Sequence, residues 1–216
     1  QAYQNSNVAV TLNLVGLQEI LYTEAGLSKS LEYLRGTNDG KMDSVHNLRD
    51  SVGADVVTLV SQDSGGCGIA RVMTTVSNAF AAEAFNVVRP SCLGQHSLAH
   101  EVGHNMGNKH DRESTTDTGA YPYSYGFRRC VSDGTGFRTV MSYSCTGGKR
   151  VAWFSNPSVH YNGYATGIAY ESSPSKAADN ARSMNNTAAT VAGFRATRGG
   201  VIVPSISVPT SPTALS

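Results

Sequence analysis

Three of the six histidines of this chain fall within eleven residues, in the segment HEVGHNMGNKHD at residues 100–111. On a helix, His100 and His104 lie four residues apart on one face, so both imidazoles can reach a single metal ion. A tetrahedral site cannot take its third ligand from the next turn of the same straight helix. Gly107 can end the helix in the left-handed conformation, which allows His110 to return and complete a three-histidine site. The spacing therefore predicts a helix that ends at a glycine beside a metal ion.

The residue next to the first histidine gives this site a chemical role. The fourth position of such a site is open to water, which is the arrangement of a catalytic zinc ion. Glu101 is close enough to reach that water without being a ligand, and it is our candidate general base. Zinc itself is inferred from the ligand type, because imidazoles also suit other transition metals. His96 would lie roughly 12 Å from His104 along a continuous helix, too far to share the ion.

Length and charge limit the remaining possibilities. The chain has 216 residues, of which 15% are charged, and a formal net charge of +1. This length suffices for one sizeable core, and the near-neutral charge argues against a nucleic-acid or anionic-membrane partner. No apolar run approaches the roughly 20 residues that a membrane-spanning helix needs. We therefore expect a mature, soluble domain.

The four cysteines are even in number and far apart in the sequence. Two disulfides, and hence an oxidising compartment, are the preferred interpretation, and the alternative is four reduced, buried thiols in a cytosolic protein. Of the three possible connectivities, Cys67 with Cys92 and Cys130 with Cys145 closes the shortest loops. The sequence alone does not determine the pairing.

The first 106 residues alternate between strand-like and helix-like patterns. Hydrophobic and polar residues alternate from Val8 to Leu14, which predicts a half-buried strand there. The other expected elements are helices over 28–35 and 41–52, strands over 55–61, 68–73 and 84–89, and a helix over about 93–106.

The second half of the chain has a different character. Residues 107–173 show little periodicity and are rich in Gly, Tyr, Ser and Asn, so we expect a loop-rich region ordered by a metal and a disulfide. A last helix is predicted from Ser173 as N-cap and Pro174 as first residue, with apolar residues at helical spacing as far as Val191. Residues 196–216 are rich in Pro, Ser and Thr and are typical of a tail or linker.

The histidine motif with its following aspartate resembles the metzincin clan of zinc endopeptidases, and Asp111 is similar to the adamalysin, or reprolysin-like, branch. The second hallmark of the clan is a methionine turn, and Met141 in TVMSYSC follows His110 by 31 residues. The segments GCGIARVM, AFNVVRPSC, SYSC and WFSNP most resemble bacterial reprolysin-like enzymes and the peptidyl-aspartate metallopeptidases. The resemblance covers residues 1–195.

The resemblance implies an α+β, metzincin-like catalytic domain. Its upper part, about residues 1–107, would carry a twisted mixed sheet with helices above an active-site cleft. Its lower part, about 108–195, would be irregular and end in a C-terminal helix, with one zinc ion between the parts. The opening QAYQNSN looks like the end of a long helix that normally follows the first strand. Either the chain lacks that strand, or the segment is a separate polypeptide or has been trimmed.

The implied function is a secreted, bacterial zinc endopeptidase that acts as a monomer on protein or peptide substrates. Zinc and Glu101 would activate water for attack on the scissile carbonyl. Tyr143, two residues after the turn methionine, is similar to a tyrosine of serralysins and astacins and is a candidate oxyanion stabiliser; the alternative is a packed tyrosine with a bonded hydroxyl. Whether calcium is also bound does not follow from these motifs.

Substrate would lie extended along the edge segment 68–74, whose first residues Gly68, Ile69, Ala70 and Arg71 are the candidate backbone contacts. In the clan, the segment after the methionine turn helps to form the pocket for the residue that follows the scissile bond. Here that segment, roughly 144–158, contains Lys149 and Arg150. Arg150 could form charge-assisted bonds with an Asp or Glu side chain, giving a preference for acidic residues there.

Two other interpretations stay open. The two cations could be solvated loop charges in an endopeptidase of broad specificity. The chain could also be a binding module that has lost catalysis, or a hydrolase of small amides. The presence of Glu101 favours the endopeptidase.

Overall fold

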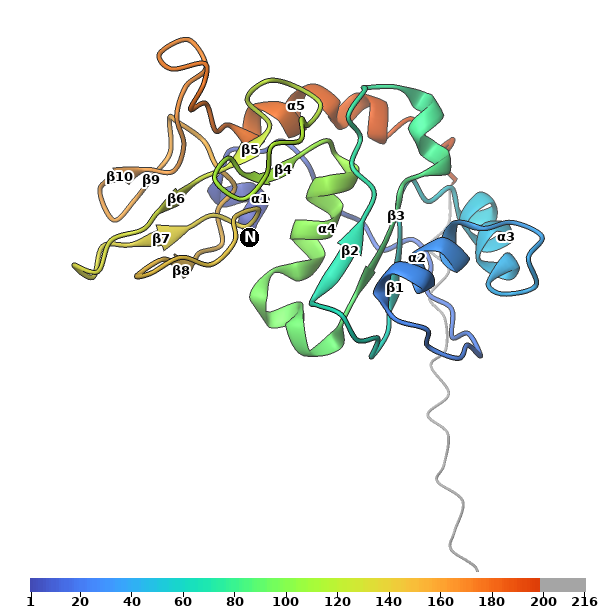
Figure 1. Ribbon diagram of the computed structural model, residues 1–216. Helices are drawn as coiled ribbons and strands as arrows, with labels where there is room; N and C mark the ends of the chain where they lie inside the picture. The colour runs from blue at the N-terminus through green and yellow to red at the C-terminus, as the bar shows by residue number, and fades with distance from the viewer. Residues whose placement is uncertain (199–216) are drawn as a thin grey trace, which may run out of the picture.

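A computed structural model describes residues 1–198, and the part of the predicted tail from residue 199 onward lies outside the described residues. Figure 1 shows helices and small sheets on both sides of a central helix, α4 (Ser97–Asn105). The largest sheet has the strand order β1-β3-β2. Strands β1 (Val57–Val60) and β3 (Phe85–Val88) run parallel, and β2 (Gly68–Ala70) is antiparallel to β3. The sheet is therefore mixed, as predicted, and β2 lies at its edge.

Two amphipathic helices precede this sheet and confirm the predictions for 28–35 and 41–52. They are α2 (Leu27–Arg35) and α3 (Asp43–Val52). The leucines of α2 recur at helical spacing and are buried against Phe85 and Val87 of β3. Each buried leucine contributes about 1.5–3 kcal/mol, so this contact fixes α2 on the sheet.

The helix that carries the first two motif histidines is shorter than predicted. The expected helix over 93–106 is divided into the 3-10 helix η2 (Pro90–Gln95) and the α-helix α4 (Ser97–Asn105). His96 separates them with a left-handed φ of 63°, so it does not lie on the same helical stripe as His100. Helix α4 packs against β2 and β3.

The region after α4 is mostly irregular, as predicted, but it contains short strands of two or three residues. Strands this short carry no detectable periodicity, so the sequence could not reveal them. They are β4 (Lys109–Asp111), β5 (Tyr125–Gly126), β6 (Arg128–Arg129), β7 (Phe137–Arg138), β8 (Lys149–Arg150), β9 (His160–Tyr161) and β10 (Tyr164–Ala165).

The last helix, α5, spans Asn180–Val191, so the predicted start at Ser173 and Pro174 is wrong. The N-cap is Asp179, whose carboxylate accepts a hydrogen bond from the Arg182 backbone N–H at 3.0 Å. A carboxylate at this position satisfies one of the free N–H groups of the first turn. The pattern Ser-Pro was therefore a weaker signal than the aspartate six residues later.

The predicted strand over 8–14 does not form. The chain begins with the short helix α1 (Ala2–Asn5), and residues 8–26 contain no helix or strand. Val8 is buried in a core shared with α4 and α5, but Leu12 and Leu14 are 49% and 73% exposed. A strand needs a hydrogen-bonded neighbour, and no described strand pairs with this segment. The alternation of apolar and polar residues was therefore not enough to predict a strand here.

The two disulfides join Cys67 to Cys92 and Cys130 to Cys145, which is the pairing that closes the shortest loops. The first connects the residue before β2 to η2, and the second connects the end of β6 to the residues before β8. Their sequence separations are 25 and 15 residues, for which loop closure is worth about 3 kcal/mol each. They constrain the segment that leads from β2 to η2, just before α4, and the loop that contains β7.

No helix within residues 1–198 is long and apolar enough to cross a membrane.

Candidate metal centre

The three motif histidines meet at one point, although they come from two elements. His100 and His104 project from α4, and His110 lies in β4. Gly107 reverses the chain between them with a φ of +90°. A Cβ atom at this position would lie 2.5 Å from the Ala120 Cβ. Glycine is therefore needed here for both conformation and space, as the motif predicted.

The ring nitrogens of these histidines are arranged as metal ligands. The Nε2 atom of His110 lies 3.2 Å from Nε2 of His100 and 3.1 Å from Nε2 of His104. Two nitrogens bound to a tetrahedral zinc ion at about 2.0–2.1 Å are about 3.3 Å apart. The Nδ1 atoms of His100 and His104 lie 2.8 Å from the carbonyl oxygens of Val140 and Asn108, so each can donate its proton away from the centre.

The electrostatic environment also suits a metal ion. Burial lowers the pKa of His100 to about 3 and that of His110 to about 4, and it lowers the pKa of His104 well below its ordinary value. The three imidazoles are therefore neutral at pH 7, and neutral imidazole is the form that binds metal. Together with the nitrogen geometry, this donor set fits zinc.

Met141 lies directly under α4. Its side chain is fully buried, and a Cβ atom at Gly103 would lie 2.7 Å from its Sδ atom. Gly103 occupies the turn between His100 and His104, so the methionine packs against the helix surface behind the metal centre. The hydrogen bond between His100 and Val140, the residue before Met141, joins the same two segments.

Glu101 lies on the other side of α4, against the sheet edge. Its side chain is 4% exposed, and a Cβ atom at Gly68 of β2 would lie 2.6 Å from its Oε1 atom. Burial raises the pKa of the Glu101 carboxyl to about 8, whereas Arg150 lowers it. The absence of a side chain at Gly68 is what leaves room for the carboxylate beside the edge strand.

The substitution Gly68→Ala is therefore expected to displace the Glu101 carboxylate, and a displacement of about 1 Å lowers a rate about 100-fold where the displaced group takes part in a reaction. The new Cβ atom would contact the Glu101 carboxylate and the Val87 carbonyl oxygen, both within 2.8 Å. Steady-state kcat/KM and thermal unfolding measure the effects on activity and folding. Gly94→Ala is the matched control, because a Cβ atom there has no neighbour within 4 Å. Activity within threefold of the unsubstituted protein would contradict this account.

The other predicted substrate contacts divide into two groups. Gly68, Ile69 and Ala70 form the edge strand β2. Arg71 lies beyond its end, and its side chain is 51% exposed and 3.6 Å from Glu83. Arg71 therefore contributes a carbonyl oxygen, bonded by the Asn105 side chain, rather than a charge near the histidines.

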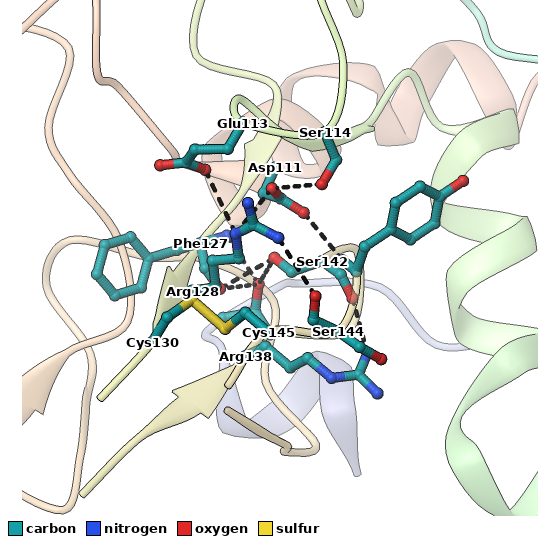
Figure 2. Close-up of polar contacts among 12 residues, drawn as sticks. Asp111, Glu113, Ser114, Phe127, Arg128, Cys130, Arg138, Ser142, Ser144 and Cys145 are labelled. Carbon is teal, nitrogen blue, oxygen red and sulfur yellow. Dashed lines mark hydrogen bonds and ion pairs between the residues drawn. A yellow bond between two sulfur atoms is a disulfide. The ribbon is translucent and has the colours of Figure 1, made fainter. Parts of the chain in front are cut away.

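Tyr143 lies beside the third histidine. The Tyr143 and His110 ring centroids are 4.1 Å apart, and the tyrosine side chain is 47% exposed. The Tyr143 backbone N–H donates a 2.9 Å hydrogen bond to Asp111 Oδ2. Asp111 is fully buried, and its other oxygen lies 3.1 Å from Arg128. Figure 2 shows how these contacts link the strand of His110 to the turn that follows Met141.

Arg150 joins the segment before α4 to the turn after Met141. It donates hydrogen bonds to the carbonyl oxygens of Gln95, just before α4, and of Ser142, just after Met141. Burial and the neighbouring Arg138 lower the pKa of its guanidinium to about 10, whereas Glu101 raises it. Lys149 is exposed.

Sequence reasoning missed Gly103 and Arg138, and it noted Asp111 only as part of the motif. Gly103 lies within the HExxH pattern at a position that the pattern leaves unspecified. Arg138 precedes Met141 by three residues in a segment without periodicity. Its position could have been found only from the pairing of β7 with its neighbours.

Comparison with known proteins gives one family match. Residues 1–111 match the family described as metallo-peptidase family M12B, reprolysin-like. A peptidyl-Asp metalloendopeptidase of Stenotrophomonas maltophilia is 41% identical over 90% of this chain, and one of Xanthomonas campestris is 38% identical over the same share. A protein of the same name from Pseudomonas fragi is 31% identical, and the match covers 90% of this chain and 98% of that protein.

The chain spans about 45% of the length of the Stenotrophomonas and Xanthomonas relatives. Among solved structures, a chain described as part of a chaperone–substrate complex is similar with a TM-score of 0.67 and 21% identity. That match covers 90% of this chain and 32% of the other. At this identity the likeness concerns the fold alone.

Proposed function

The chain belongs to the reprolysin-like metallopeptidases of family M12B, and from this premise we propose that it is a zinc-dependent endopeptidase that hydrolyses peptide bonds in proteins. The single observation that carries the proposal is the convergence of three neutral imidazoles: the Nε2 atoms of His100 and His104 lie 3.2 Å and 3.1 Å from that of His110, and Glu101 lies on the helix of the first two. His100, His104 and His110 would hold one zinc ion.

When bound, zinc supplies Lewis acidity that polarises a carbonyl group and makes a water molecule more acidic. Glu101 is the general base in this proposal: its carboxylate accepts the proton of the attacking water and later donates it to the leaving amine. Its burial supports this role, since a raised pKa makes the carboxylate a stronger base than an exposed glutamate. Gly68 keeps the carboxylate free to turn between water and amine.

A peptide is the proposed substrate class because β2 offers its backbone at a sheet edge. The order β1-β3-β2 leaves the outer side of β2 without a strand partner in residues 1–198. An extended peptide can pair with such an edge through main-chain hydrogen bonds. A surface pocket lined by Gly68 and Ile69 on one side and by Leu27, Lys29 and Glu32 of α2 on the other provides space beside the strand.

Tyr143 is the proposed oxyanion stabiliser, supported by its position beside His110. We expect Tyr143→Phe to lower kcat about 100-fold with little change in KM, because removing one oxyanion donor typically costs 100-fold or more. Steady-state kinetics on a quenched fluorescent peptide measures this. Tyr164→Phe removes another partly exposed hydroxyl and is the control. An unchanged kcat would leave Tyr143 as a side chain that only packs against the histidine.

We further propose a preference for Asp or Glu on the carboxyl side of the cut, supported by Arg150 and by the peptidyl-Asp names of the relatives. Cleavage of a proteome-derived peptide library tests it. Enrichment of acidic residues after the cut supports the preference, and no enrichment would favour an enzyme of broad specificity. The relatives are bacterial, and the two disulfides support secretion into an oxidising environment.

The experiment that tests the function is digestion of unfolded casein by the zinc-loaded protein, followed by mass spectrometry of the products. New peptides with free amino termini are expected to accumulate in proportion to enzyme concentration. An intact substrate, together with measurable peptide binding by calorimetry, would instead identify a binding module.

A further inference from the structure

Three arginines form a row across the small sheet β6-β7-β8. In this sheet Arg138 of β7 pairs with Arg128 of β6 on one side and with Arg150 of β8 on the other. Residues that pair directly across strands have their side chains on the same face, and like charges in such positions repel each other. A row of this kind therefore needs nearby negative charge.

Only one end of the row, Arg128, forms ion pairs with acidic side chains in the described part of the chain. Arg128 lies 3.1 Å from the buried Asp111 carboxylate and 3.6 Å from Glu113, and Figure 2 shows both contacts. Within residues 1–198, no carboxylate oxygen lies within 4.0 Å of the Arg138 or Arg150 guanidinium. The other two cations of the row are therefore not paired with acidic side chains.

Arg138 and Arg150 are bonded to backbone oxygens instead. Both donate to the carbonyl oxygen of Ser142, at 2.8 Å and 3.3 Å, and Arg150 also donates to Gln95 at 3.2 Å. Each guanidinium retains a buried Nε–H group without a hydrogen-bond partner in the described part of the chain. Both side chains are only partly buried, so an anion can approach the outer nitrogens of these two adjacent cations and supply the negative charge that the protein does not.

The location of this pair connects it with the metal centre. Ser142 directly follows Met141, and Gln95 lies just before α4, so the two arginines lie between the helix of the histidines and the turn beneath it. Arg150 also influences the pKa values of Glu101, His100 and His110, which is consistent with this proximity.

We propose that Arg138 and Arg150 together form a two-arginine clamp for the side-chain carboxylate of the residue that follows the scissile bond. This inference rests on the proposed endopeptidase function and deepens it, because it assigns Arg138 as a second specificity-determining residue. A carboxylate has two oxygens and can accept hydrogen bonds from both guanidinium groups at once. The clamp also gives a reason for placing Arg138 and Arg150 side by side without an acidic partner in the described residues.

A purely structural role of Arg138 and Arg150 would have a different effect on activity. If both arginines only hold the Ser142 carbonyl oxygen, their loss would disturb the turn after Met141 and affect all substrates alike. The ratio of activities toward an acidic and a neutral substrate separates the two roles, because a change in the turn does not alter this ratio.

The test uses two peptides that differ only in Asp or Asn after the scissile bond, with kcat/KM measured for each. The unsubstituted protein is expected to favour Asp, and Arg138→Gln and Arg150→Gln are each expected to lower the Asp:Asn ratio about 10- to 100-fold, the range for a charged hydrogen bond. Lys149→Gln is the matched control, since this exposed cation pairs with Phe137 and lies on the opposite face of the sheet.

An unchanged Asp:Asn ratio in Arg138→Gln would overturn the clamp, as would a ratio near one in the unsubstituted protein. If that protein cleaves neither peptide, the proposed peptidase function fails instead, so the two failures are distinguishable. If thermal unfolding shows that Arg138→Gln is not folded, Arg138→Lys is used in its place, because lysine keeps the positive charge but lacks the planar guanidinium group. It is expected to lower the ratio as well, and an unchanged ratio in this variant also contradicts the clamp.

Discussion

Glu101→Gln is expected to lower kcat/KM for peptide hydrolysis about 10³- to 10⁴-fold, the upper range for loss of a general acid–base. The amide cannot accept the proton of the attacking water, yet it has nearly the same size as the carboxylate. That matters here because the side chain is 4% exposed and fits against Gly68. Glu101 is not one of the three clustered imidazoles, so zinc content should not change.

The measurement combines peptide kinetics with zinc content determined by mass spectrometry on the same preparation. Glu171→Gln is a suitable control, because its side chain is 67% exposed and bonded to Arg182. Activity within tenfold of the unsubstituted protein would rule out Glu101 as the base. Loss of zinc together with activity would instead mean that Glu101 maintains the metal centre.

Removal of the metal is expected to abolish peptidase activity and to destabilise the fold. Two buried imidazoles and the half-buried imidazole of His110 point toward one another, and without an ion their Nε2 atoms have no other bonding partner within residues 1–198. A ligand that binds only the folded state adds about 4 kcal/mol of stability at a free concentration 1,000 times its Kd. Dialysis against a chelator should remove this contribution and lower the melting temperature.

Thermal unfolding with and without chelator measures the change, and re-addition of zinc should restore both activity and melting temperature. His104→Ala should be inactive, and its melting temperature should no longer respond to chelator. His160→Ala replaces an exposed histidine of β9 and should behave like the unsubstituted protein. If chelator lowers the melting temperature of His104→Ala as much as that of the unsubstituted protein, the metal that stabilises the fold is bound elsewhere.

Local sequence patterns predicted the secondary structure correctly wherever a few neighbouring residues decide the backbone conformation. Helices α2 and α3 follow from amphipathic spacing, and the turn after α4 follows from Gly107. The predicted strand over 8–14 failed because a strand depends on a partner elsewhere in the chain. The start of α5 was wrong because Asp179 provides the cap in place of Ser173.

The sequence by itself determined the cluster of three histidines, because His100, His104 and His110 are brought together by one helix and one glycine turn. Only the tertiary structure decided what surrounds them. Gly68 lies against Glu101, and Val140 accepts a hydrogen bond from His100 across 40 residues of sequence. The pairing of Arg138 with Arg150 likewise depends on the register of two short strands. Contacts between distant segments result from the packing of the whole chain, which residue spacing does not record.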